Sequence, residues 1–540
     1  MRKHPMRGKK PVSAKRKLFD PNAVLTELHS ALKRDLQTHK HVYRGPDISS
    51  IEAFEIQVRD FDKKYVPAGF DDSGQEAECW DLFGSINSHM LDTNLKLIFG
   101  LPSSAERIQS WMPFMDKVHL RARALVHFVL GRFDEDEWFH YCKNSSGATI
   151  GVPFTDTSLE KKFTFPMSST ARVERFWRRY LQYDFQLCCA LEKSNAGVNQ
   201  DIEPVIGSRA TTVDKTKTKR RMICVEPTLN MFFQQGLMQM MYKRLADVGI
   251  DLESAQERHM KLAQEASITG RKATIDFSSA SDCVSIELLR WLLPPEWFDV
   301  CDVVRSSHTY LNGRWVELQM MSTMGNATTF PLETLVFWAY AHATALSLGR
   351  SNSLFPEWEQ LKSVAVFGDD CIVDSDIAIP FMEVATEIGF MVNGEKSFFG
   401  AERFRESCGG DYLAGRSVRP YHCKAPVNLR MSSLAPWLYI IGNALLKKYI
   451  RYFGELSYIY DKELWRVYFS LFTRHDISIR FVPPDYPDDS GLKWSFDRDR
   501  LENLYRFLSE PVYVDRHGTC YFTYHRFVYR KRERQEPDLR

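Results

Sequence analysis

The sequence has no apolar run long enough to cross a membrane and no cysteine pair spaced to bind zinc. Its longest apolar stretch lies between Glu333 and Arg350 and falls short of the ~18 residues that a transmembrane helix needs. The eleven cysteines include no C-x-x-C motif, and the adjacent Cys188 and Cys189 suit neither a shared zinc ion nor a simple disulfide framework. The amino terminus lacks the apolar core of a secretory signal. We therefore expect a protein of a reducing cytosol, with no membrane partner.

The sequence also lacks a strong net charge, since its formal charge is only +2. Its basic residues are unevenly placed, because residues 1–17 hold eight Lys or Arg and no acid. An apolar content of 44% is typical of a globular protein, and a length of 540 residues suggests several subdomains. We interpret residues 1–17 as an arm that contacts RNA or a ribonucleoprotein, with a transit peptide as the lesser alternative.

Apolar periodicity predicts two long helices in the first half of the chain. Residues 169–193 have apolar side chains at helical spacing, with Ser169 or Thr170 as the N-cap. Residues 226–250 predict a mostly buried helix, whose Met and Phe side chains we interpret as core. Between these segments lies a polar and strongly basic stretch that runs into a short β-like sequence.

From residue 271 onward, short strands alternate with helices. A helix over 281–295 is expected to start near Ser281 or Asp282 and to stop at the Pro294-Pro295 pair. Mostly helical sequence follows residue 430, and a terminal hairpin is predicted over 512–530 with its turn at His517-Gly518. Strands in this order build an α+β layer with helices on one side of an antiparallel sheet. The other predicted elements are strands at 272–278, 314–321 and 390–393, helices at 325–346 and 380–389, and a hairpin at 363–374.

Two adjacent aspartates stand in the middle of the predicted hairpin SVAVFGDDCIVD. Asp369 and Asp370 follow Gly368, so a tight turn displays both carboxylates at the tip. Like charges side by side repel each other, and burial adds to the cost, which a bound cation relieves. A solvated Gly-Asp turn is the ordinary alternative, and these residues alone leave it open.

Other segments supply the remaining groups of a phosphoryl-transfer site. Asp276 follows a short apolar strand, and acids at the ends of separate strands can converge on Mg²⁺ or Mn²⁺. Two such ions, ~3.5–4 Å apart, activate an attacking hydroxyl and stabilise the leaving group. Positive charge is needed around the phosphates, although a basic run can also be a solvated loop. The basic run here contains Lys215, Lys217, Lys219, Arg220 and Arg221.

In this order, TIDFSSASD, STMGNATTFPLE, VFGDD and GEKS resemble motifs A, B, C and D of viral RNA-dependent RNA polymerases. The upstream KTKTKRRMICVEP resembles motif F, and CGGDYLAGRSVRP resembles the region of motif E. EPTLNMFFQQG and STMGNATTF are particularly similar to the replicases of the small single-stranded RNA phages, the leviviruses. The motif-rich resemblance covers about residues 205–420, and the three acids do not depart from the pattern.

The resemblance implies a role for each acidic residue. Asp276, Asp369 and Asp370 would be the catalytic carboxylates and hold two Mg²⁺ ions, with Mn²⁺ as an alternative. Phe277 would lend a backbone carbonyl. The carboxylates would set the ions against the 3′-hydroxyl of the RNA and the α-phosphate of the incoming nucleotide.

The resemblance also implies contacts to the nucleotide. Asp282 and Asn326 would recognise the ribose 2′-hydroxyl, with helix capping as the alternative role for each. Ser322, Thr323 and Gly325 would form a loop that supports the template and the ribose, and Gly325 would allow close backbone approach.

Basic residues would complete the implied site. Lys396 resembles a lysine that acts as general acid toward the pyrophosphate, with an ordinary surface lysine as the alternative. Lys217, Lys219, Arg220 and Arg221 would clamp the triphosphate. Arg221 is the strongest single candidate because it is nearest the apolar strand.

The family fold implied is a right hand with an antiparallel-sheet palm. Fingers and the amino-terminal arm would occupy 1–260 with motif F at 211–227, the palm 261–420, and the thumb and carboxyl-terminal region 421–540. Implied partners are template and product RNA, nucleoside triphosphates, the host elongation factors Tu and Ts, and for some members a ribosomal protein. The implied location is the cytoplasm of a bacterial host.

Three rival functions remain open from the sequence. A reverse transcriptase would share the metal carboxylates, but Asp282 and Asn326 favour an enzyme that prefers ribonucleotides. A non-catalytic RNA-binding protein would suit the basic ends, but three intact carboxylates argue against it. A metal nuclease would shorten RNA instead of extending it, and the motif order argues against this.

Overall fold

The computed structural model describes most of the chain and divides it into two compact units. The described residues of Met1–Phe70 and Pro420–Arg540 form the first unit, and those of Asp71–Arg419 form the second. The basic arm at 1–17 lies outside the described residues. The description covers residues 18–42, 48–67, 73–103, 107–153, 155–194, 202–350, 363–453, 462–493, 513–514 and 520–521.

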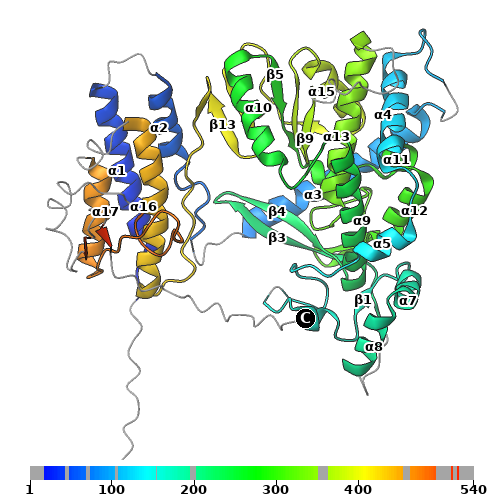
Figure 1. The fold of residues 1–540 in the computed structure, drawn as a ribbon, viewed down its shortest axis with the longest axis horizontal. Helices are drawn as coiled ribbons and strands as arrows, with labels where there is room; N and C mark the ends of the chain where they lie inside the picture. The colour runs from blue at the N-terminus through cyan, green and yellow to red at the C-terminus, as the bar shows by residue number, and fades with distance from the viewer. Residues whose placement is uncertain are drawn as a thin grey trace, which may run out of the picture. The chain divides into compact units, whose positions relative to one another are not determined.

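The first unit is mainly helical. Asp35 accepts hydrogen bonds from the backbone N–H groups of Glu463 (2.7 Å) and Leu464 (3.0 Å) and from the hydroxyl of Tyr449 (2.9 Å). Since the first amides of a helix have no partner within it, this one buried carboxylate caps the last helix and ties three helices together. The helices of this unit are α1 (Pro21–Val42), α2 (Ile48–Asp60), α16 (Met431–Phe453) and α17 (Glu463–Arg474), which Figure 1 shows as a bundle.

A three-stranded antiparallel sheet lies at the centre of the second unit. Its strand order is β5 (Lys272–Ile275), β10 (Asp370–Asp374), β9 (Ala365–Phe367). Side chains of β10 alternate between two apolar environments: Cys371 and Val373 join the main core, whereas Ile372 packs with Ala263 of α10 (Ala255–Thr269). Both faces of the sheet are therefore covered by helices, which explains the continuous apolar run of β10, and the prediction of helices on one side only is wrong.

One almost wholly buried helix supports this sheet. In α13 (Thr329–Ala345) every residue except Phe330 is buried, so the helix has no polar face. It packs against α4 (Phe114–Leu130), α15 (Ala378–Glu387) and β9. The sequence-based prediction of a buried helix here is confirmed.

A second sheet has four strands in the order β4, β3, β7, β8. Its bounds are β3 (Ser208–Thr216), β4 (Lys219–Val225), β7 (His308–Leu311) and β8 (Arg314–Glu317). Strands β3 and β7 are parallel, and the other neighbours are antiparallel. The hairpin of β7 and β8 turns at Asn312-Gly313, whose φ angles of 45° and 84° are those of a type I′ turn.

The remaining described elements surround these sheets. Aromatic side chains of α5 (Glu135–Tyr141), α7 (Glu174–Tyr183) and α9 (Thr228–Asp247) form a dense cluster, in which Trp138 packs edge-on against Phe176 with 4.9 Å between ring centroids. The helices are α3 (Ser73–Gly100), α5 (Glu135–Tyr141), α6 (Leu159–Lys162), α7 (Glu174–Tyr183), α8 (Phe185–Ser194), α9 (Thr228–Asp247), η1 (Ala280–Asp282), α11 (Ile286–Leu292), α12 (Pro295–Val304) and η2 (Leu346–Arg350). The short strands are β1 (Ser168–Ser169), β2 (Glu203–Pro204), β6 (Phe277–Ser278), β11 (Met391–Val392), β12 (Phe404–Ser407), β13 (Gly410–Leu413) and β14 (Arg416–Ser417).

Two of the predicted helices differ from the observed ones. The single helix predicted over 169–193 is wrong, because Ser169 lies in β1 and the segment forms α7 and α8 with a break at Asp184. The predicted start near Ser281 or Asp282 is also wrong, because Ser285 caps α11 by accepting the N–H of Leu288. Asp282 instead ends the short 3-10 turn η1.

Other predictions of local structure are confirmed. The hairpin at 363–374, the helix near 226–250 and the helical region after 430 are all present. The terminal hairpin pairs β15 (Tyr513–Val514) with β16 (Cys520–Tyr521), while its predicted turn lies outside the described residues. The fold is α+β with several small sheets, and the three-part division into fingers, palm and thumb stays a prediction.

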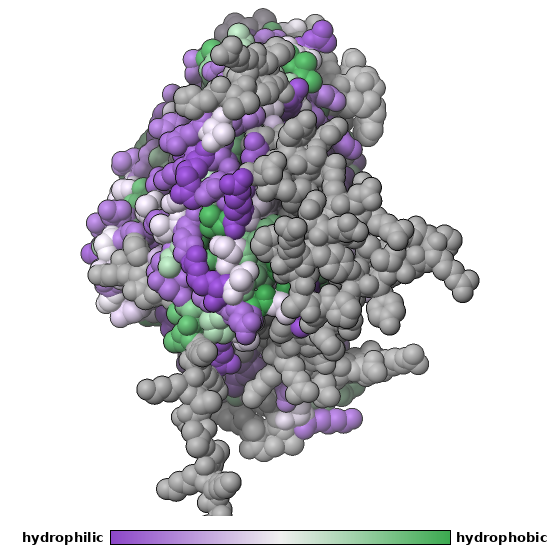
Figure 2. All heavy atoms as spheres, turned by 90° about the vertical axis from the view of Figure 1, so that its left-hand side faces the viewer, coloured by the Kyte–Doolittle hydropathy of each residue, from purple (hydrophilic) through white to green (hydrophobic). Residues whose placement is uncertain are grey.

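Surface and hydropathy agree with this architecture. On the face drawn in Figure 2, hydrophilic side chains make up most of the coloured surface and hydrophobic ones form small patches. Of the helices that the structure describes, none is both long and apolar enough to span a bilayer.

Candidate functional site

The predicted Gly-Asp turn is the two-residue loop between β9 and β10. Phe367 pairs with Asp370, and Gly368 has a φ of 62°, as the first position of a type II′ turn requires. The N–H of Gly368 donates to the hydroxyl of Thr334 (3.0 Å), and a Cβ at this position would lie 2.5 Å from the ring of Phe330. Because both contacts come from α13, the buried helix fixes the turn that displays the two aspartates.

The third predicted carboxylate lies beside this turn. Cys371 pairs with Ile275, so continuing the register by one residue places Asp276 opposite Asp370. Asn393 donates its amide N–H to Oδ2 of Asp276 (2.7 Å). The structure thus brings the three predicted acids together at one end of neighbouring strands.

Burial raises the pKa of both hairpin aspartates. For Asp370 the pKa rises to about 7, because repulsion from Asp369 and Asp276 adds to the loss of hydration, while the backbone N–H of Cys408 (3.1 Å from Oδ2) opposes the rise. The pKa of Asp369 is also raised, first by burial and then by Asp276, against the cations of Arg221 and Lys215. Uncompensated negative charge of this kind favours the binding of a cation.

Two residues of the basic segment act on the carboxylates. The positive charges of Arg221 and Lys215 both lower the pKa of Asp369, and that of Arg221 also lowers the pKa of Asp282. Arg221 belongs to the predicted clamp. Lys215 was identified as part of the basic run but not as part of the clamp, and it joins Arg221 at this site.

The other predicted clamp residues are placed differently. Arg220 donates from Nε to the hydroxyl of Thr212 (2.8 Å) and forms an ion pair with Asp214 (3.1 Å), so its guanidinium is held within its own hairpin. Lys217 lies in the turn between β3 and β4, and Lys219 is the first residue of β4, so both are at the tip of that hairpin. Of the four predicted residues, the structure therefore brings Arg221 to the carboxylates.

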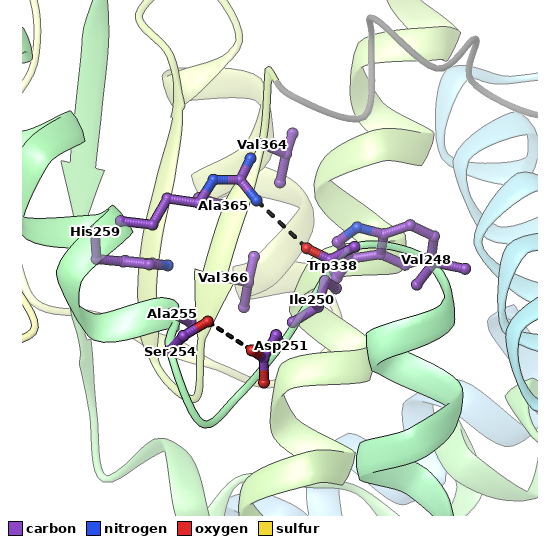
Figure 3. Close-up of a pocket in the computed structure, with 12 residues that line it drawn as sticks. Val248, Ile250, Asp251, Ser254, Ala255, His259, Trp338, Val364, Ala365 and Val366 are labelled. Carbon is purple, nitrogen blue, oxygen red and sulfur yellow. Dashed lines mark hydrogen bonds between the residues drawn. The ribbon is translucent and has the colours of Figure 1, made fainter.

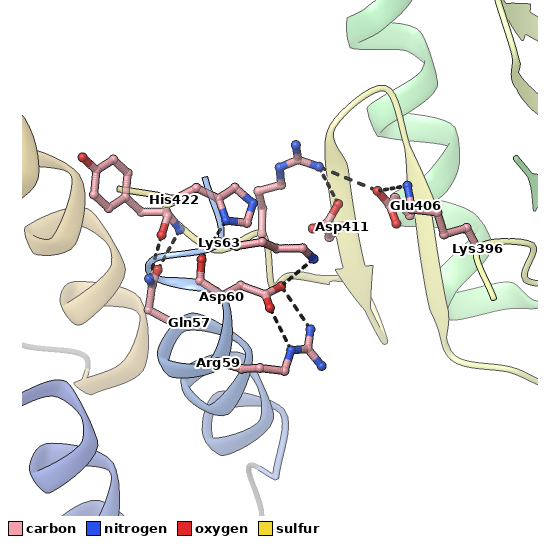
Figure 4. A network of polar contacts seen from close by, with 10 residues as sticks. Gln57, Arg59, Asp60, Lys63, Lys396, Glu406, Asp411 and His422 are labelled. Carbon is pink, nitrogen blue, oxygen red and sulfur yellow. Dashed lines mark hydrogen bonds and ion pairs between the residues drawn. The ribbon is translucent and has the colours of Figure 1, made fainter. Parts of the chain in front are cut away.

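Lys396 is part of a charged network beside the aspartates. Its ammonium lies 4.0 Å from Oδ1 of Asp276 and 3.7 Å from Oε1 of Glu406. Glu406 lies 4.0 Å from Arg419, which pairs with Asp411 at 2.9 Å (Figure 4). Burial lowers the pKa of Lys396, but Glu406 and the aspartates outweigh it and raise the pKa overall. The lysine is therefore charged at neutral pH and aimed at the site.

The predicted ribose contacts do not cap helices. Asp282 is buried and accepts the backbone N–H of Met324 (3.1 Å), and burial raises its pKa to about 6. Asn326 accepts from both the N–H and the hydroxyl of Thr323 (2.8 Å each) and donates to Gln234 (3.4 Å). These bonds join the loop at 322–327 to η1 and α9, and they replace the capping alternative.

The loop also approaches the basic hairpin closely, as predicted for Gly325. Gly325 has a φ of 117°, and a Cβ there would lie 2.2 Å from the carbonyl oxygen of Cys224 in β4. The N–H of Cys224 donates to the carbonyl of Met324 (2.8 Å). Ser322 is buried, and its hydroxyl has no hydrogen-bond partner within the described residues.

Two buried acids near the site were missed by the sequence reasoning. Glu333 of α13 is wholly buried, Oε1 has no partner within the described residues, and burial followed by repulsion from Asp369 raises its pKa well above the usual value. Burial raises the pKa of Glu226 to about 7, against hydrogen bonds from Ser306 and Gln234. A glutamate inside an otherwise apolar helix was the available signal for Glu333.

The chemistry of the three aspartates fits a hard divalent cation. Carboxylate oxygens are the ligands that Mg²⁺ prefers, and Asp276 lies close enough to Asp369 and Asp370 that its charge raises the pKa of both. As arranged, no three His, Cys, Asp or Glu side chains of the described ranges form a finished metal cluster. Oδ2 of Asp276 is held by Asn393 and Oδ1 faces Lys396, so that side chain would have to turn to join its neighbours.

A separate small pocket lies behind the hairpin. It measures about 70 Å³ and is lined by residues at the end of α9, the start of α10, and β9, with Trp338 and His259 among them (Figure 3). His259 bonds to the hydroxyl of Ser407 (2.9 Å), and burial lowers its pKa to about 4. None of Asp276, Asp369 and Asp370 lines this pocket.

Comparison with known proteins identifies the family. The family model for RNA replicase, beta-chain, matches residues 69–479. The RNA-directed RNA polymerase beta chain of Enterobacteria phage fr is 32% identical over 374 residues, which are 66% of this chain and 61% of the relative. That of Escherichia phage MS2 is 33% identical over 364 residues, 67% of this chain and 62% of the relative. The corresponding subunit of Escherichia virus Qbeta is 30% identical over 377 residues, 68% and 59%.

The chain belongs to the RNA replicase beta-chain family. The resemblance to levivirus replicases is therefore confirmed. The aligned part of the chain spans about three fifths of the length of these curated relatives.

Proposed function

We propose that this chain is an RNA-dependent RNA polymerase that replicates a single-stranded RNA phage genome by transferring nucleotides from NTPs to an RNA 3′ end. The observation that carries the proposal is that Asp276, Asp369 and Asp370 lie together at neighbouring ends of β5 and β10. The positive charges of Arg221 and Lys215 act on this group of acids. The names of the relatives support the same activity. Acids and cations in this arrangement suit transfer of a phosphoryl group, in which charge stabilisation and positioning do most of the catalysis.

The three aspartates would hold two Mg²⁺ ions, with Mn²⁺ as an alternative. When bound, these ions supply activation of the 3′-hydroxyl and charge stabilisation at the α-phosphate and pyrophosphate. The backbone carbonyl of Phe277 is an additional candidate ligand, because the residue directly follows Asp276.

The basic residues would act on the triphosphate. Arg221 and Lys215 are placed to neutralise its negative charge, since they already act on the charge of Asp369. Lys396 is held beside Asp276 with its proton, which it can donate from Nζ to the leaving pyrophosphate. Lys217 and Lys219, at the hairpin tip, would meet the nucleotide on its way in.

The loop at 322–327 would select the sugar. Asp282 and Asn326 already hydrogen-bond to the loop backbone and to Thr323, so a ribose 2′-hydroxyl would join an existing polar network. A site built to bond a hydroxyl rejects the sugar that lacks it, because buried polar groups are then left unpaired. The unpartnered hydroxyl of Ser322 adds one donor to this network.

We further propose the right-hand arrangement, with the sheet of β5, β10 and β9 as the palm. The host partners proposed are elongation factors Tu and Ts and a ribosomal protein, in the cytoplasm of a bacterial host. These proposals rest on family membership.

The proposed activity is tested by incorporation of labelled ribonucleotides. The chain is purified with its co-purifying proteins, supplied with elongation factors Tu and Ts, and given a C-rich single-stranded RNA template and Mg²⁺. Asp369→Asn should abolish product. Asp374→Asn is the matched control, because Asp374 lies at the other end of β10 and pairs with Lys272 (2.9 Å), and it should retain activity.

The outcomes separate the alternatives. Product made from deoxyribonucleotides as readily as from ribonucleotides would indicate a reverse transcriptase. Wild-type protein that binds RNA but makes no product would favour the RNA-binding alternative. An Asp369→Asn variant as active as wild type would show that the hairpin aspartate is an ordinary turn residue.

A further inference from the structure

One face of the four-stranded sheet carries an exposed row of aromatic and basic side chains. The register pairs Arg209 with Tyr310 and Tyr310 with Trp315, so the three side chains lie next to one another across β3, β7 and β8. Tyr310 is 41% exposed and Trp315 is 39% exposed. Their ring centroids are 5.3 Å apart, with planes inclined at 61°.

The same face leads to the carboxylate site. Val213 pairs with Arg221, which puts Arg221 on the side of the sheet that Arg209 shares, since alternate residues of a strand point the same way. From Arg221 to Trp315 the path crosses three strand spacings and about four residues along the strands. Spacings of ~4.8 Å and ~3.3 Å make this roughly 20 Å. Arg221 itself acts on Asp369.

The opposite face of the sheet is closed. Thr212, Thr309 and Leu311 are buried there, and the hydroxyl of Thr212 donates to Glu76 of α3 (3.1 Å). The row of Arg209, Tyr310 and Trp315 therefore lies on the solvent-exposed face of the sheet, opposite the face that packs into the core.

That chemistry fits an unpaired nucleic-acid strand. Aromatic rings stack on bases of any sequence, and arginines beside them contact phosphates. In the described part of the chain, neither Arg209 nor Arg221 takes part in an ion pair, so both guanidinium groups are available. Within these four strands, the acidic residue on this face is Glu317, which pairs with His308. A purely structural aromatic pair would explain Tyr310 and Trp315 but not Arg209 beside them, nor Arg221 on the same face near the carboxylates.

We propose that Tyr310 and Trp315 form a stacking platform for the unpaired template strand, with Arg209 contacting its backbone. The inference rests on the proposed function, because it needs a template that runs to the carboxylates. In template-directed synthesis the template is unpaired ahead of the point of addition, whereas the new strand behind it is paired. Bases ahead of that point are therefore free to stack.

Binding of defined RNA duplexes tests the platform without any nucleotide addition. A fluorescent primer–template with a 5′ template overhang of either two or ten nucleotides is titrated with protein, and anisotropy gives the Kd. The double variant Tyr310→Ala/Trp315→Ala should bind the long overhang about tenfold or more weakly. It should bind the short overhang within about twofold of wild type.

Three further variants make the result specific. Tyr310→Phe/Trp315→Phe keeps both rings and should bind the long overhang as wild type does, which separates stacking from folding. Trp111→Ala removes an exposed ring elsewhere, 78% exposed before α4, and should have no effect. Arg209→Gln should reduce the slope of log Kd against log salt by about 0.7 for the long overhang.

Other results would overturn the platform. The assignment is rejected if the double alanine variant binds both overhangs like wild type, or if it loses binding of both equally. It is also rejected if the variant binds RNA normally while losing a co-purifying protein, which would identify a protein interface. A different result would reject the proposed polymerase function and keep the platform. The wild-type protein would then prefer the long overhang through Tyr310 and Trp315 but never extend the primer.

Discussion

Replacing Gly368 by alanine should both destabilise the second unit and abolish nucleotide addition. The glycine occupies a φ of 62°, a region that costs an L-residue about 1–2 kcal/mol. The new Cβ would also lie 2.5 Å from the ring of Phe330, which packs edge-on against Phe367 at 4.7 Å between centroids. Moving that ring within a filled core costs about 1–3 kcal/mol.

Together these terms predict a loss of about 2–5 kcal/mol in the free energy of unfolding. Unfolding entropy is about 2.1 cal/mol/K per residue, so the roughly 350 residues of Asp71–Arg419 give about 0.7 kcal/mol/K. The expected fall in apparent Tm is then about 3–7 °C. Activity should fall much further, because the same turn carries Asp369 and Asp370.

Scanning calorimetry and the incorporation assay check the two effects. Gly84→Ala is the matched control, since Gly84 lies inside α3 with nothing within 4 Å of a new Cβ. Alanine there should stabilise the helix by about 0.5–1 kcal/mol and leave activity unchanged. A Gly368→Ala variant that melts within 1 °C of wild type and remains active would refute the argument that α13 fixes the turn.

Three further variants test the surrounding site. Asp370→Asn should raise the free energy of unfolding at pH 8 in EDTA by up to about 4 kcal/mol. Its folded pKa of about 7 exceeds the usual 3.8, so the native carboxyl loses stability as pH rises between these values; urea melts at pH 5 should show a smaller gain. Gly325→Ala should open the contact with Cys224, seen as faster hydrogen exchange in β4. Lys396→Met should change stability by under about 1 kcal/mol because the lysine is half exposed. Rapid-quench measurements should nevertheless show nucleotide addition slowed by about 10²-fold or more.

Local signals identified the central part of the site well. Gly368 followed by two aspartates between apolar runs predicted a tight hairpin, and the structure has one. The prediction succeeded because turn type depends on a few neighbouring residues. The basic run was harder, since Arg220 and Arg221 are adjacent in sequence and yet point to opposite faces of β4. Strand alternation could have separated them, but it does not tell which face meets the carboxylates.

Long-range contacts explain the errors in secondary structure. Residues 169–193 have a helical pattern, but Thr170 is held by Asn230 of α9, whose side chain accepts from its N–H (3.0 Å) and donates to its hydroxyl (2.9 Å). That contact keeps the start of the segment extended. Asp282 is likewise a residue type that often caps helices, but its carboxylate accepts the N–H of Met324 instead.

By itself, the sequence determined the order of the motifs, and with it the family, the hairpin aspartates and the buried helices. Each of these depends on residue types at short spacing. Tertiary structure alone placed Asp276 beside Asp370, about 90 residues away in the chain, and brought Glu333 within reach of the charge of Asp369. It also turned Lys215 and Arg221 toward the acids. The reason is physical: the register of β5 and β10 is set by side chains packing on both faces of the sheet, and that packing exists only once the chain is folded.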